Sequence, residues 1–259
     1  MTNPLVLAAG SMLDCTASEM MAAAAGAGFD GVGLRLSGEH AGDPAVLRGE
    51  ARTLGLTIHD TEVHRIGSDA GDPTELLDRS AALGVRSVLV VSDLDDRATT
   101  RALLTRVASL CRERSLRPGL EYMAWTDPCD PIDAIDMARE SGCALVVDLL
   151  HHVRLGCGPD EIEAIVDSGT LGWVQLCDAP IVAPADLIDE ARHHRLPPGL
   201  GALPLRELLA PVPAATTISV EVQSDELLST HPAGRARLLH DSARALLVHG
   251  SGGSPRTGT

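Results

Sequence analysis

Aromatic side chains are scarce in this sequence, and Phe29, Tyr122, Trp125 and Trp173 are the complete set. Proteins that bind single-stranded bases stack them on such side chains, so the scarcity argues against nucleic-acid binding. Positive charge is also in short supply, with 21 Lys and Arg against 36 Asp and Glu and a formal net charge of −15. An acidic surface repels phosphate backbones and anionic membranes. We therefore expect a small-molecule substrate as the partner, rather than a nucleic acid or a membrane.

Long apolar runs and paired cysteines are missing too. No run approaches the roughly 20 residues of a membrane-spanning helix, and the opening segment MTNPLVLAAG lacks the basic and apolar regions of a secretion signal. The six cysteines are scattered without a CxxC pair, several of them in apolar runs, where Cys behaves as a small hydrophobe. These features predict a reduced, soluble, cytoplasmic protein.

What the sequence does contain is a regular alternation of short apolar runs with Ala- and Leu-rich helical stretches. The apolar runs are Leu5–Ala8, Gly31–Leu36, Leu56–His59, Ser87–Val91, Leu116–Glu121, Ala144–Asp148, Trp173–Leu176 and Thr217–Val222. Many helical stretches end in Gly, which favours a left-handed C-cap. Eight strand–helix units predict an α/β fold with a parallel sheet, and eight units close into a single (β/α)8 TIM barrel of about this length. An open doubly wound sheet is the alternative, but no GxGxxG follows the first run.

We expect one barrel domain over residues 1–249. The longest connection follows the seventh run, with PADLIDEARHHR as a short helix and LPPGLGALP as a loop. Residues 250–259, GSGGSPRTGT, are small and polar, and we expect them to form a disordered tail.

Polar residues that are costly to bury stand at the ends of the last four apolar runs. They are Glu121, Asp148, Gln175 and Glu221. The carboxyl ends of barrel strands converge on one face, and acids buried there need a cation because they lose their hydration. We therefore predict one divalent metal ion bound by these four residues. Their oxygen ligands favour Mn²⁺ or Mg²⁺, and Co²⁺ or Zn²⁺ could substitute.

Simpler interpretations exist for the same residues. Glu121 and Glu221 could pair with buried arginines such as Arg117 or Arg35. Asp148 could merely cap the following helix, which is a common role for Asp after a strand. The metal site is favoured because all four polar residues stand at the same end of consecutive strands.

Other residues near the strand ends are candidates for substrate contact. In LTIHDTEVH, His59, Glu62 and His64 could face the same mouth. We choose His59 as a substrate-binding residue, with a structural role as an equal alternative. Arg192 and Arg195 lie in the connection after the seventh run and could bind a carboxylate or a phosphate. Solvated helix charge is the alternative for both, and Arg192 is the one we predict to bind substrate.

The four strand-end residues resemble the metal set of the xylose isomerase-like barrel superfamily. Its members include sugar phosphate isomerases and epimerases, inosose dehydratases, 3-dehydroshikimate dehydratases and type-IV apurinic endonucleases. The family set is Glu, Asp, His or Gln, and Glu on strands five to eight, matching Glu121, Asp148, Gln175 and Glu221. The Asp-x-x-His element, in which the His contacts substrate, matches Asp148 and His151. The resemblance covers nearly the whole barrel, from AAGAGFDGVGLRL through the eighth strand.

Two departures from the family pattern bear on the substrate. Most sugar epimerases of this kind have His on strand seven, whereas this chain has Gln175. That Gln and the segment QLCDAP resemble the bacterial 3-dehydroshikimate dehydratases. Family members often follow strand seven with a segment like PGEG, and PPGLG here has Leu200 in place of the Glu.

These features lead us to expect a metal-dependent enzyme that removes a proton next to a carbonyl of a small polyhydroxylated sugar or cyclic keto acid. Glu121, Glu221 or His151 would move the proton. Return of the proton makes an isomerase or epimerase of carbohydrate metabolism, and loss of the neighbouring hydroxyl makes a lyase; the sequence leaves both open. A homo-oligomer is compatible with the sequence.

Two other classes are alternatives to this enzyme. One is a barrel subunit with little activity of its own that works beside a partner chain. The other is an apurinic endonuclease, which is disfavoured by the charge of −15 and by the lack of recognisable extra histidines for a three-metal cluster.

Overall fold

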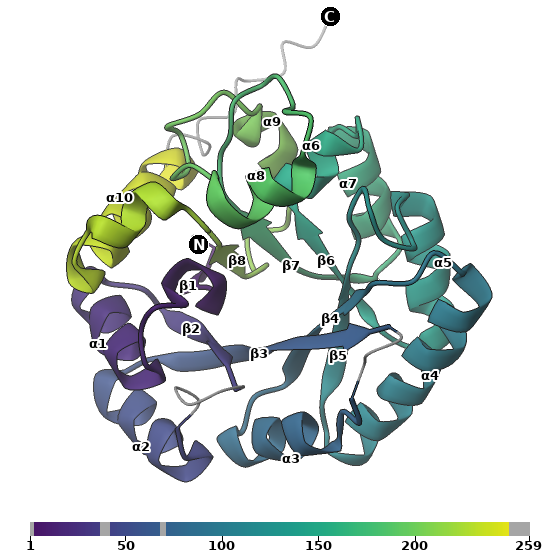
Figure 1. Ribbon diagram of the computed structural model, residues 1–259, viewed down its shortest axis with the longest axis horizontal. Helices are drawn as coiled ribbons and strands as arrows, with labels where there is room; N and C mark the ends of the chain where they lie inside the picture. The colour runs from purple at the N-terminus through teal and green to yellow at the C-terminus, as the bar shows by residue number, and fades with distance from the viewer. Residues whose placement is uncertain (1–2, 37–41, 68–70, 249–259) are drawn as a thin grey trace, which may run out of the picture.

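Eight parallel strands close into a barrel in chain order, from β1 to β8 (Figure 1). The computed structural model describes residues 3–36, 42–67 and 71–248. The strands are β1 (Leu5–Leu7), β2 (Gly31–Arg35), β3 (Thr57–Ile66), β4 (Ser87–Ser92), β5 (Arg117–Glu121), β6 (Ala144–Asp148), β7 (Leu171–Leu176) and β8 (Ile218–Val220). Because β1 pairs with β8, the sheet has no open edge. The predicted single TIM barrel is confirmed, and the open doubly wound sheet is excluded.

Most of the helices surround this barrel on its outside, whereas η1 and α8 lie at its mouth (Figure 1). The helices are η1 (Ala9–Met12), α1 (Ala17–Ala27), α2 (Pro44–Leu54), α3 (Thr74–Leu83), α4 (Arg97–Glu113), α5 (Pro131–Ser141), α6 (Leu149–Arg154), α7 (Pro159–Asp167), α8 (Leu187–His193), α9 (Leu205–Leu209), η2 (Asp225–Ser229) and α10 (Pro232–Val248). The predicted glycine caps are present: Gly28, Gly55, Gly84 and Gly142 end helices with φ of 95°, 72°, 82° and 81°. A side chain would strain that backbone conformation, which glycine adopts freely.

The third strand is much longer than its sequence pattern predicts. We expected it to end at His59, but β3 continues to Ile66 with irregular register against both neighbouring strands. The extra residues carry Glu62 up to the mouth of the barrel and leave His59 deeper inside. A polar stretch such as DTEVHR hides a strand because the strand forms by pairing with β2 and β4, and such pairing cannot be read from local propensity.

The lower part of the barrel interior is filled by apolar side chains. Leu89, Val146 and Trp173 form a cluster there, with Val63 packed against it. Gly119 makes room for this cluster, because a Cβ at that position would overlap the Trp173 ring. This part of the interior is therefore a packed core, with the His59 ring against Trp173.

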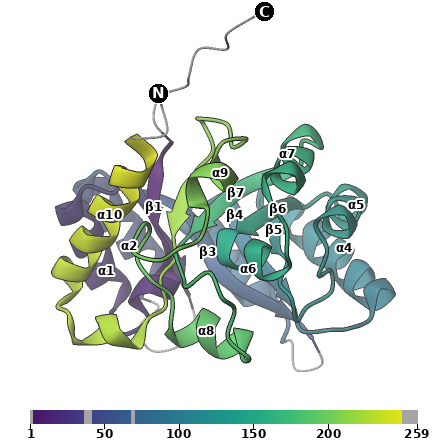
Figure 2. The same ribbon diagram turned by 90° about the horizontal axis from the view of Figure 1, so that it is seen from above.

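The connection between β7 and β8 folds back over the carboxyl ends of the strands. Figure 2 shows α8 at the end of the barrel opposite to the one where β1 begins. The Asp178 carboxylate accepts hydrogen bonds from the backbone N–H groups of Ala179, Gly199 and Leu203. The Arg154 guanidinium forms a buried, two-pronged ion pair with Glu190 of α8. These contacts join the start of the connection to its later loop and join α8 to α6, and they hold α8 beside the mouth.

The expected disordered tail, residues 250–259, lies outside the residues that the structure describes. Among the described residues, no helix combines the length and the apolar character needed to cross a membrane.

Candidate functional site

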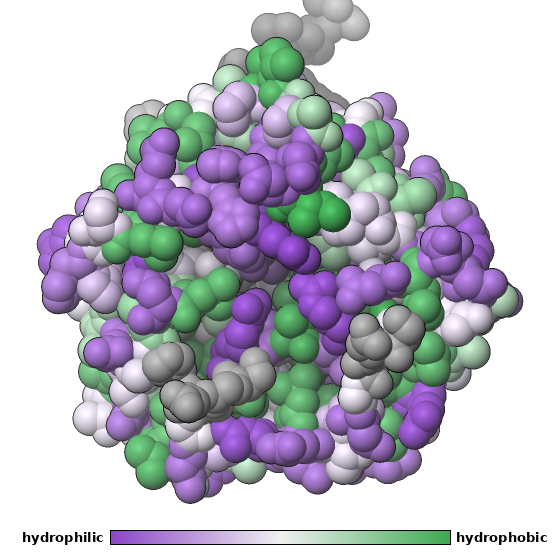
Figure 3. Space-filling model, in the orientation of Figure 1, coloured by the Kyte–Doolittle hydropathy of each residue, from purple (hydrophilic) through white to green (hydrophobic). Residues whose placement is uncertain are grey.

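A cavity of about 380 Å³ opens at the carboxyl ends of the strands. Figure 3 looks onto this face, where hydrophilic side chains gather around the middle. Four arginines and three glutamates line the cavity, namely Arg35, Arg65, Arg192, Arg195, Glu62, Glu121 and Glu221. Its volume lies in the range of sites that hold one small molecule. In a chain with a net charge of −15, the cavity thus carries nearly equal numbers of arginines and acids.

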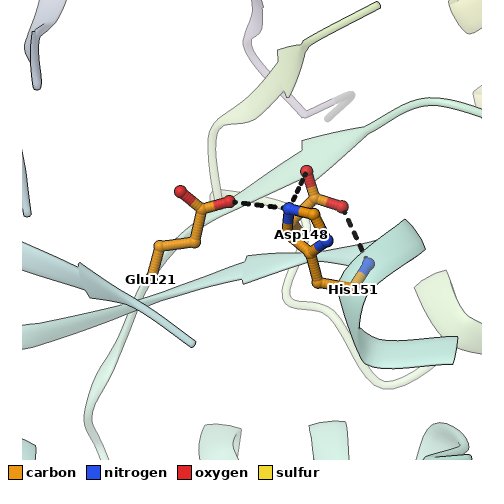
Figure 4. A group of neighbouring side chains, drawn as sticks. All are labelled: Glu121, Asp148 and His151. Atoms are coloured by element: carbon orange, nitrogen blue, oxygen red, sulfur yellow. Dashed lines mark hydrogen bonds and ion pairs between the residues drawn. The ribbon is translucent and has the colours of Figure 1, made fainter. Parts of the chain in front are cut away.

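Glu121, Asp148 and His151 form a compact buried group at this mouth (Figure 4). Each offers one ligand atom, and the three atoms lie within 4.8 Å of one another. His151 Nε2 lies 3.5 Å from Glu121 Oε1 and 4.0 Å from Asp148 Oδ2. Such a group of two carboxylates and an imidazole could hold a divalent ion.

Asp148 has two tasks, one for each carboxylate oxygen. Its Oδ1 accepts hydrogen bonds from the N–H groups of Leu150 and His151 and so caps α6. Its Oδ2 turns toward the site and accepts from Arg195 Nη1 at 2.6 Å. The capping role that we gave as an alternative is therefore real, and it leaves the second oxygen facing the other site residues.

Gln175 and Glu221 are the other two residues of the predicted set, and Glu221 is not part of the compact group. Gln175 pairs in register with Asp148 on one side and with Ser219 on the other. Its buried Oε1 has no hydrogen-bond partner, so an acceptor oxygen is left over next to the carboxylates. Glu221 follows β8 and packs so closely against Gly10 that a Cβ there would overlap its Oε1. The fold thus brings an amide oxygen without a partner to the same end of the barrel as three acids.

Arg195 is the cation that the acids contact. Its Nη1 lies 2.6 Å from Asp148 Oδ2 and 3.6 Å from Glu221 Oε2. The alternative partners that we considered for the glutamates are wrong, because Arg117 bonds to the Cys143 carbonyl and Arg35 pairs with Glu62. Asp148 and Glu221 share this guanidinium, whereas Glu121 contacts His151, so that three ionised acids would face one positive charge and leave two negative charges uncompensated. A single divalent cation would balance that charge.

The pKa values reflect this excess of buried acid. Burial and then the Glu221 and Asp148 charges raise the pKa of Glu121 well above its ordinary value. Burial also raises the pKa of Glu221, to about 7. For Asp148, burial acts in the same direction, but the Arg195 and His151 contacts leave its pKa below the ordinary value. The unbalanced charge is therefore concentrated on the two glutamates.

His151 is neutral at physiological pH. Burial lowers its pKa to about 4. Arg195 Nη2 lies 3.3 Å from His151 Nε2, and a guanidinium can only donate, so Nε2 is the acceptor and the ring proton sits on Nδ1. His152 differs, because it bonds to the Tyr122 hydroxyl and the Gly158 carbonyl and serves the packing of α6. His151, unlike His152, thus presents an unprotonated ring nitrogen to the candidate site.

The two residues chosen for substrate contact end in different places. His59 is absent from the residues that line the cavity; it lies edge-on to the Trp173 ring at 5.4 Å, and burial lowers its pKa to about 4. Arg192 does line the cavity and is exposed. Solvated charge, our alternative for both arginines, fits the exposure of Arg192 but is wrong for buried Arg195.

Sequence reasoning named Glu62 as a candidate at the mouth but missed its ion pair with Arg35, and it missed Trp125. Arg35 and Glu62 form an ion pair of 2.8 Å on the cavity wall, and Gly10 N–H also donates to Glu62. Trp125 lines the cavity and packs edge-on against His151 at 5.0 Å between ring centres. The place of Glu62 on the cavity wall depends on the full length of β3, which only the structure shows. Nothing in the local sequence marks Trp125.

Comparisons with known proteins agree with this architecture. The model of the family described as xylose isomerase-like TIM barrel matches residues 21–246. A 3-dehydroshikimate dehydratase from Pseudomonas aeruginosa is 30% identical over 236 residues, which cover 82% of this chain and 37% of that protein. The chain thus spans little more than a third of the length of this curated relative.

Solved structures share the fold. A xylose isomerase-like TIM barrel/4-hydroxyphenylpyruvate dioxygenase fusion protein superposes with a TM-score of 0.80 at 24% identity, covering 99% of this chain and 46% of that one. A protein called IOLI, solved with a bound zinc atom, gives a TM-score of 0.83 at 13% identity and covers 96% of this chain and all of its own. At these identities the likeness establishes the fold.

Proposed function

The chain belongs to the xylose isomerase-like TIM barrel family, and we propose that it is a divalent-metal-dependent enzyme that removes a proton next to a carbonyl of a small polyhydroxylated substrate. We favour the dehydratase outcome on a cyclic keto acid of the 3-dehydroshikimate type. The observation that carries the proposal is the excess of buried acid at the mouth: Asp148 and Glu221 share one guanidinium, Glu121 contacts a neutral imidazole, and the Gln175 amide oxygen has no partner.

The residues present fit a divalent metal ion. Glu121, Asp148 and Glu221 would contribute carboxylate oxygens, and Gln175 Oε1 would contribute the amide oxygen that otherwise stays unsatisfied. Oxygen ligands of this kind suit Mn²⁺ or Mg²⁺, with Co²⁺ or Zn²⁺ as substitutes. When bound, the ion supplies a Lewis acid that polarises a substrate carbonyl.

Three side chains in the site can accept the proton that is removed from the substrate. Neutral His151 presents Nε2 to the site. Burial raises the pKa of both glutamates, and the pKa of about 7 for Glu221 suits proton transfer near neutral pH. The sequence contains no lysine, so a route through a Schiff base with a lysine side chain is excluded. Trp125 packs against His151 and helps to keep bulk water away from it.

Dehydration then follows from the position of the leaving group. The electrons of the broken C–H bond form a C=C bond, the C–O bond of the neighbouring carbon breaks, and the hydroxyl leaves with a proton as water. If that carbon bears no leaving hydroxyl, the same site returns the proton and acts as an epimerase or isomerase. We favour dehydration because of the strand-seven Gln175 and the 30% identity to a 3-dehydroshikimate dehydratase.

Arginines at the cavity wall favour an anionic substrate. Within the described part of the chain, the Arg192 guanidinium has no hydrogen-bond or ion-pair partner, and it lines the cavity. A guanidinium without a protein partner suits a carboxylate, because its N–H donors match the two carboxylate oxygens. We therefore keep Arg192 as a substrate-binding residue and withdraw His59, which lies below the cavity beside Trp173.

Elemental analysis and a dehydration assay test this proposal together. We expect about one divalent ion per chain and conversion of 3-dehydroshikimate to an aromatic product, seen as new ultraviolet absorbance. A chelator abolishes the activity and Mn²⁺ or Mg²⁺ restores it. Glu121→Gln loses metal and activity together, whereas Glu113→Gln, at an exposed glutamate of α4, keeps both.

Three other results point elsewhere. Conversion of ketoses without dehydration would assign the epimerase outcome to the same site. A protein that neither retains nor is stabilised by Mn²⁺, Mg²⁺, Co²⁺ or Zn²⁺ would be a barrel with structural carboxylates, and would favour the subunit that works beside a partner chain. Cleavage of abasic DNA with three bound metals would indicate the endonuclease.

A further inference from the structure

One ion pair on the cavity wall has no part in the reaction proposed above. Arg35 Nη2 donates to Glu62 Oε2 at 2.8 Å, and both residues line the cavity of about 380 Å³. The Glu62 side chain is only 2% exposed, and that of Arg35 is 33% exposed. The Glu62 carboxylate also accepts from the Gly10 backbone N–H at 3.3 Å. Two donors thus fix the acid, and the acid holds the guanidinium in one place on the wall.

This pair has hydrogen-bonding capacity that the protein leaves unused. Among the described residues, Arg35 hydrogen-bonds only to Glu62, and its Nε is shielded from solvent without a partner. Each carboxylate oxygen of Glu62 accepts one hydrogen bond from the described residues, although such an oxygen can accept two. Donors and acceptors therefore remain available side by side.

The charge of the pair distinguishes it from Arg192. The charges of Arg35 and Glu62 cancel, whereas Arg192 has no ion-pair partner in the described part of the chain. A substrate carboxylate is attracted by Arg192, but beside Arg35 it would also meet the negative charge of Glu62. A hydroxyl both donates and accepts, so it can bond to both members of the pair without charge repulsion.

The pair also lies across the mouth from two of the proposed metal ligands. Arg35 ends β2, and Glu62 lies on β3. Because the eight strands close in chain order, these strands face β6 and β7, which carry Asp148 and Gln175. A cavity of this volume holds one small molecule. A ring whose carbonyl lies at the strand-end ligands would therefore extend toward the pair.

We propose that Arg35 and Glu62 form a hydroxyl-recognition pair: Glu62 holds Arg35 in position, and the two together bind a substrate hydroxyl on the side of the cavity across from Asp148 and Gln175. The carboxylate of the same substrate is left to Arg192. This assignment rests on the proposed function and deepens it, since it names the residues that select a hydroxylated ring. An analogue without the hydroxyl leaves polar groups of the pair unpaired, which is how such sites reject it.

Calorimetric titration with two unreactive ligands tests this assignment, with Mg²⁺ present. Shikimate carries the ring, the carboxylate and hydroxyls but no ketone, and cyclohexenecarboxylate carries the same ring and carboxylate without hydroxyls. The double variant Arg35→Met/Glu62→Gln leaves the net charge of the cavity unchanged. Its ratio of shikimate affinity to cyclohexenecarboxylate affinity should fall about tenfold or more, because hydrogen bonds to charged groups are lost. Arg192→Met should weaken both ligands alike.

Glu62→Gln alone gives a test that depends on sign. The change keeps the size of the side chain and frees the Arg35 charge, so cyclohexenecarboxylate should bind more tightly than it binds to the wild type, while the affinity ratio falls. A purely structural role of Glu62 instead predicts weaker binding of both ligands. Arg101→Met is the matched control, because Arg101 forms an exposed pair with Glu140 outside the cavity, and it should bind both ligands as the wild type does.

A further measurement needs only the folded wild type. In protein with ¹⁵N-labelled arginine, the Arg35 Nε–H signal, identified by its loss in Arg35→Lys, should shift more with shikimate than with cyclohexenecarboxylate. Equal shifts overturn the assignment.

The calorimetric outcomes separate this assignment from the proposed function. An unchanged affinity ratio in the double variant, or weaker binding of both ligands by Glu62→Gln, overturns the assignment and leaves the metal-dependent enzyme intact. Binding of neither ligand by the wild type overturns the cyclic keto-acid substrate and this assignment together.

Discussion

The buried ion pair between Arg154 and Glu190 makes a sharp prediction about what holds the mouth in place. Both side chains are nearly inaccessible, at 2% and 3% exposure. Glu190 accepts from Arg154 Nε at 2.7 Å and from Nη2 at 2.6 Å. The guanidinium also donates to the carbonyls of Pro180 and Ile181. Arg154 thus fastens the β7–β8 connection, which carries the cavity residues Arg192 and Arg195, to α6.

Glu190→Gln removes the negative charge and keeps the size of the side chain. Breaking a buried pair in this way costs about 3–5 kcal/mol, since one charge is left uncompensated. The two carbonyl acceptors of Arg154 remain, so we expect the lower end of that range. For a domain of this size, a loss of about 3 kcal/mol lowers the Tm by roughly 6–12 °C. Urea unfolding followed by circular dichroism measures the free energy directly.

Glu140→Gln is the matched control. Glu140 pairs with Arg101 at 2.9 Å, but both side chains are about half exposed, at 53% and 49%. Exposed pairs contribute about 0–1 kcal/mol, so this variant should unfold almost as the wild type does. If Glu190→Gln lost less than about 1 kcal/mol, or no more than Glu140→Gln, the buried pair would not be what holds the connection.

Two further predictions concern the barrel interior and the acids above it. Gly119→Ala should lower the free energy of unfolding by about 1–3 kcal/mol in urea unfolding because its Cβ would overlap Trp173, whereas Gly49→Ala, which meets open space on α2, should stabilise by about 0.5–1 kcal/mol; equal effects would contradict the packing argument. Burial raises the pKa of Glu221 from 4.5 to about 7, so its contribution to the stability of the metal-free protein is complete below about pH 4.5 and is lost as the pH rises through about 7. Mn²⁺ needs the ionised carboxylate, so the Tm gain from Mn²⁺ in differential scanning fluorimetry should be larger at pH 8 than at pH 6, and an equal gain at both would show that Glu221 is not a ligand.

Much of the fold could be predicted because its signals are local. Apolar runs and glycine caps recur with each strand–helix unit, and each helix cap forms between residues close in sequence. The exception is β3, which the sequence pattern predicts to end at His59. Its continuation through Glu62 depends on pairing with β2 and β4, and strand formation in a polar segment follows from such neighbours.

The candidate site also has one part that the sequence predicts and another that only the structure shows. The sequence by itself determined that Glu121, Asp148, Gln175 and Glu221 stand at the ends of consecutive strands, because parallel strands place their carboxyl ends at one face. Only the tertiary structure decided which cation meets these acids. Arg195 lies 47 residues from Asp148 along the chain, and its burial depends on how the β7–β8 connection folds over the mouth. Charge pairing between distant segments is set by packing, and no local pattern encodes it.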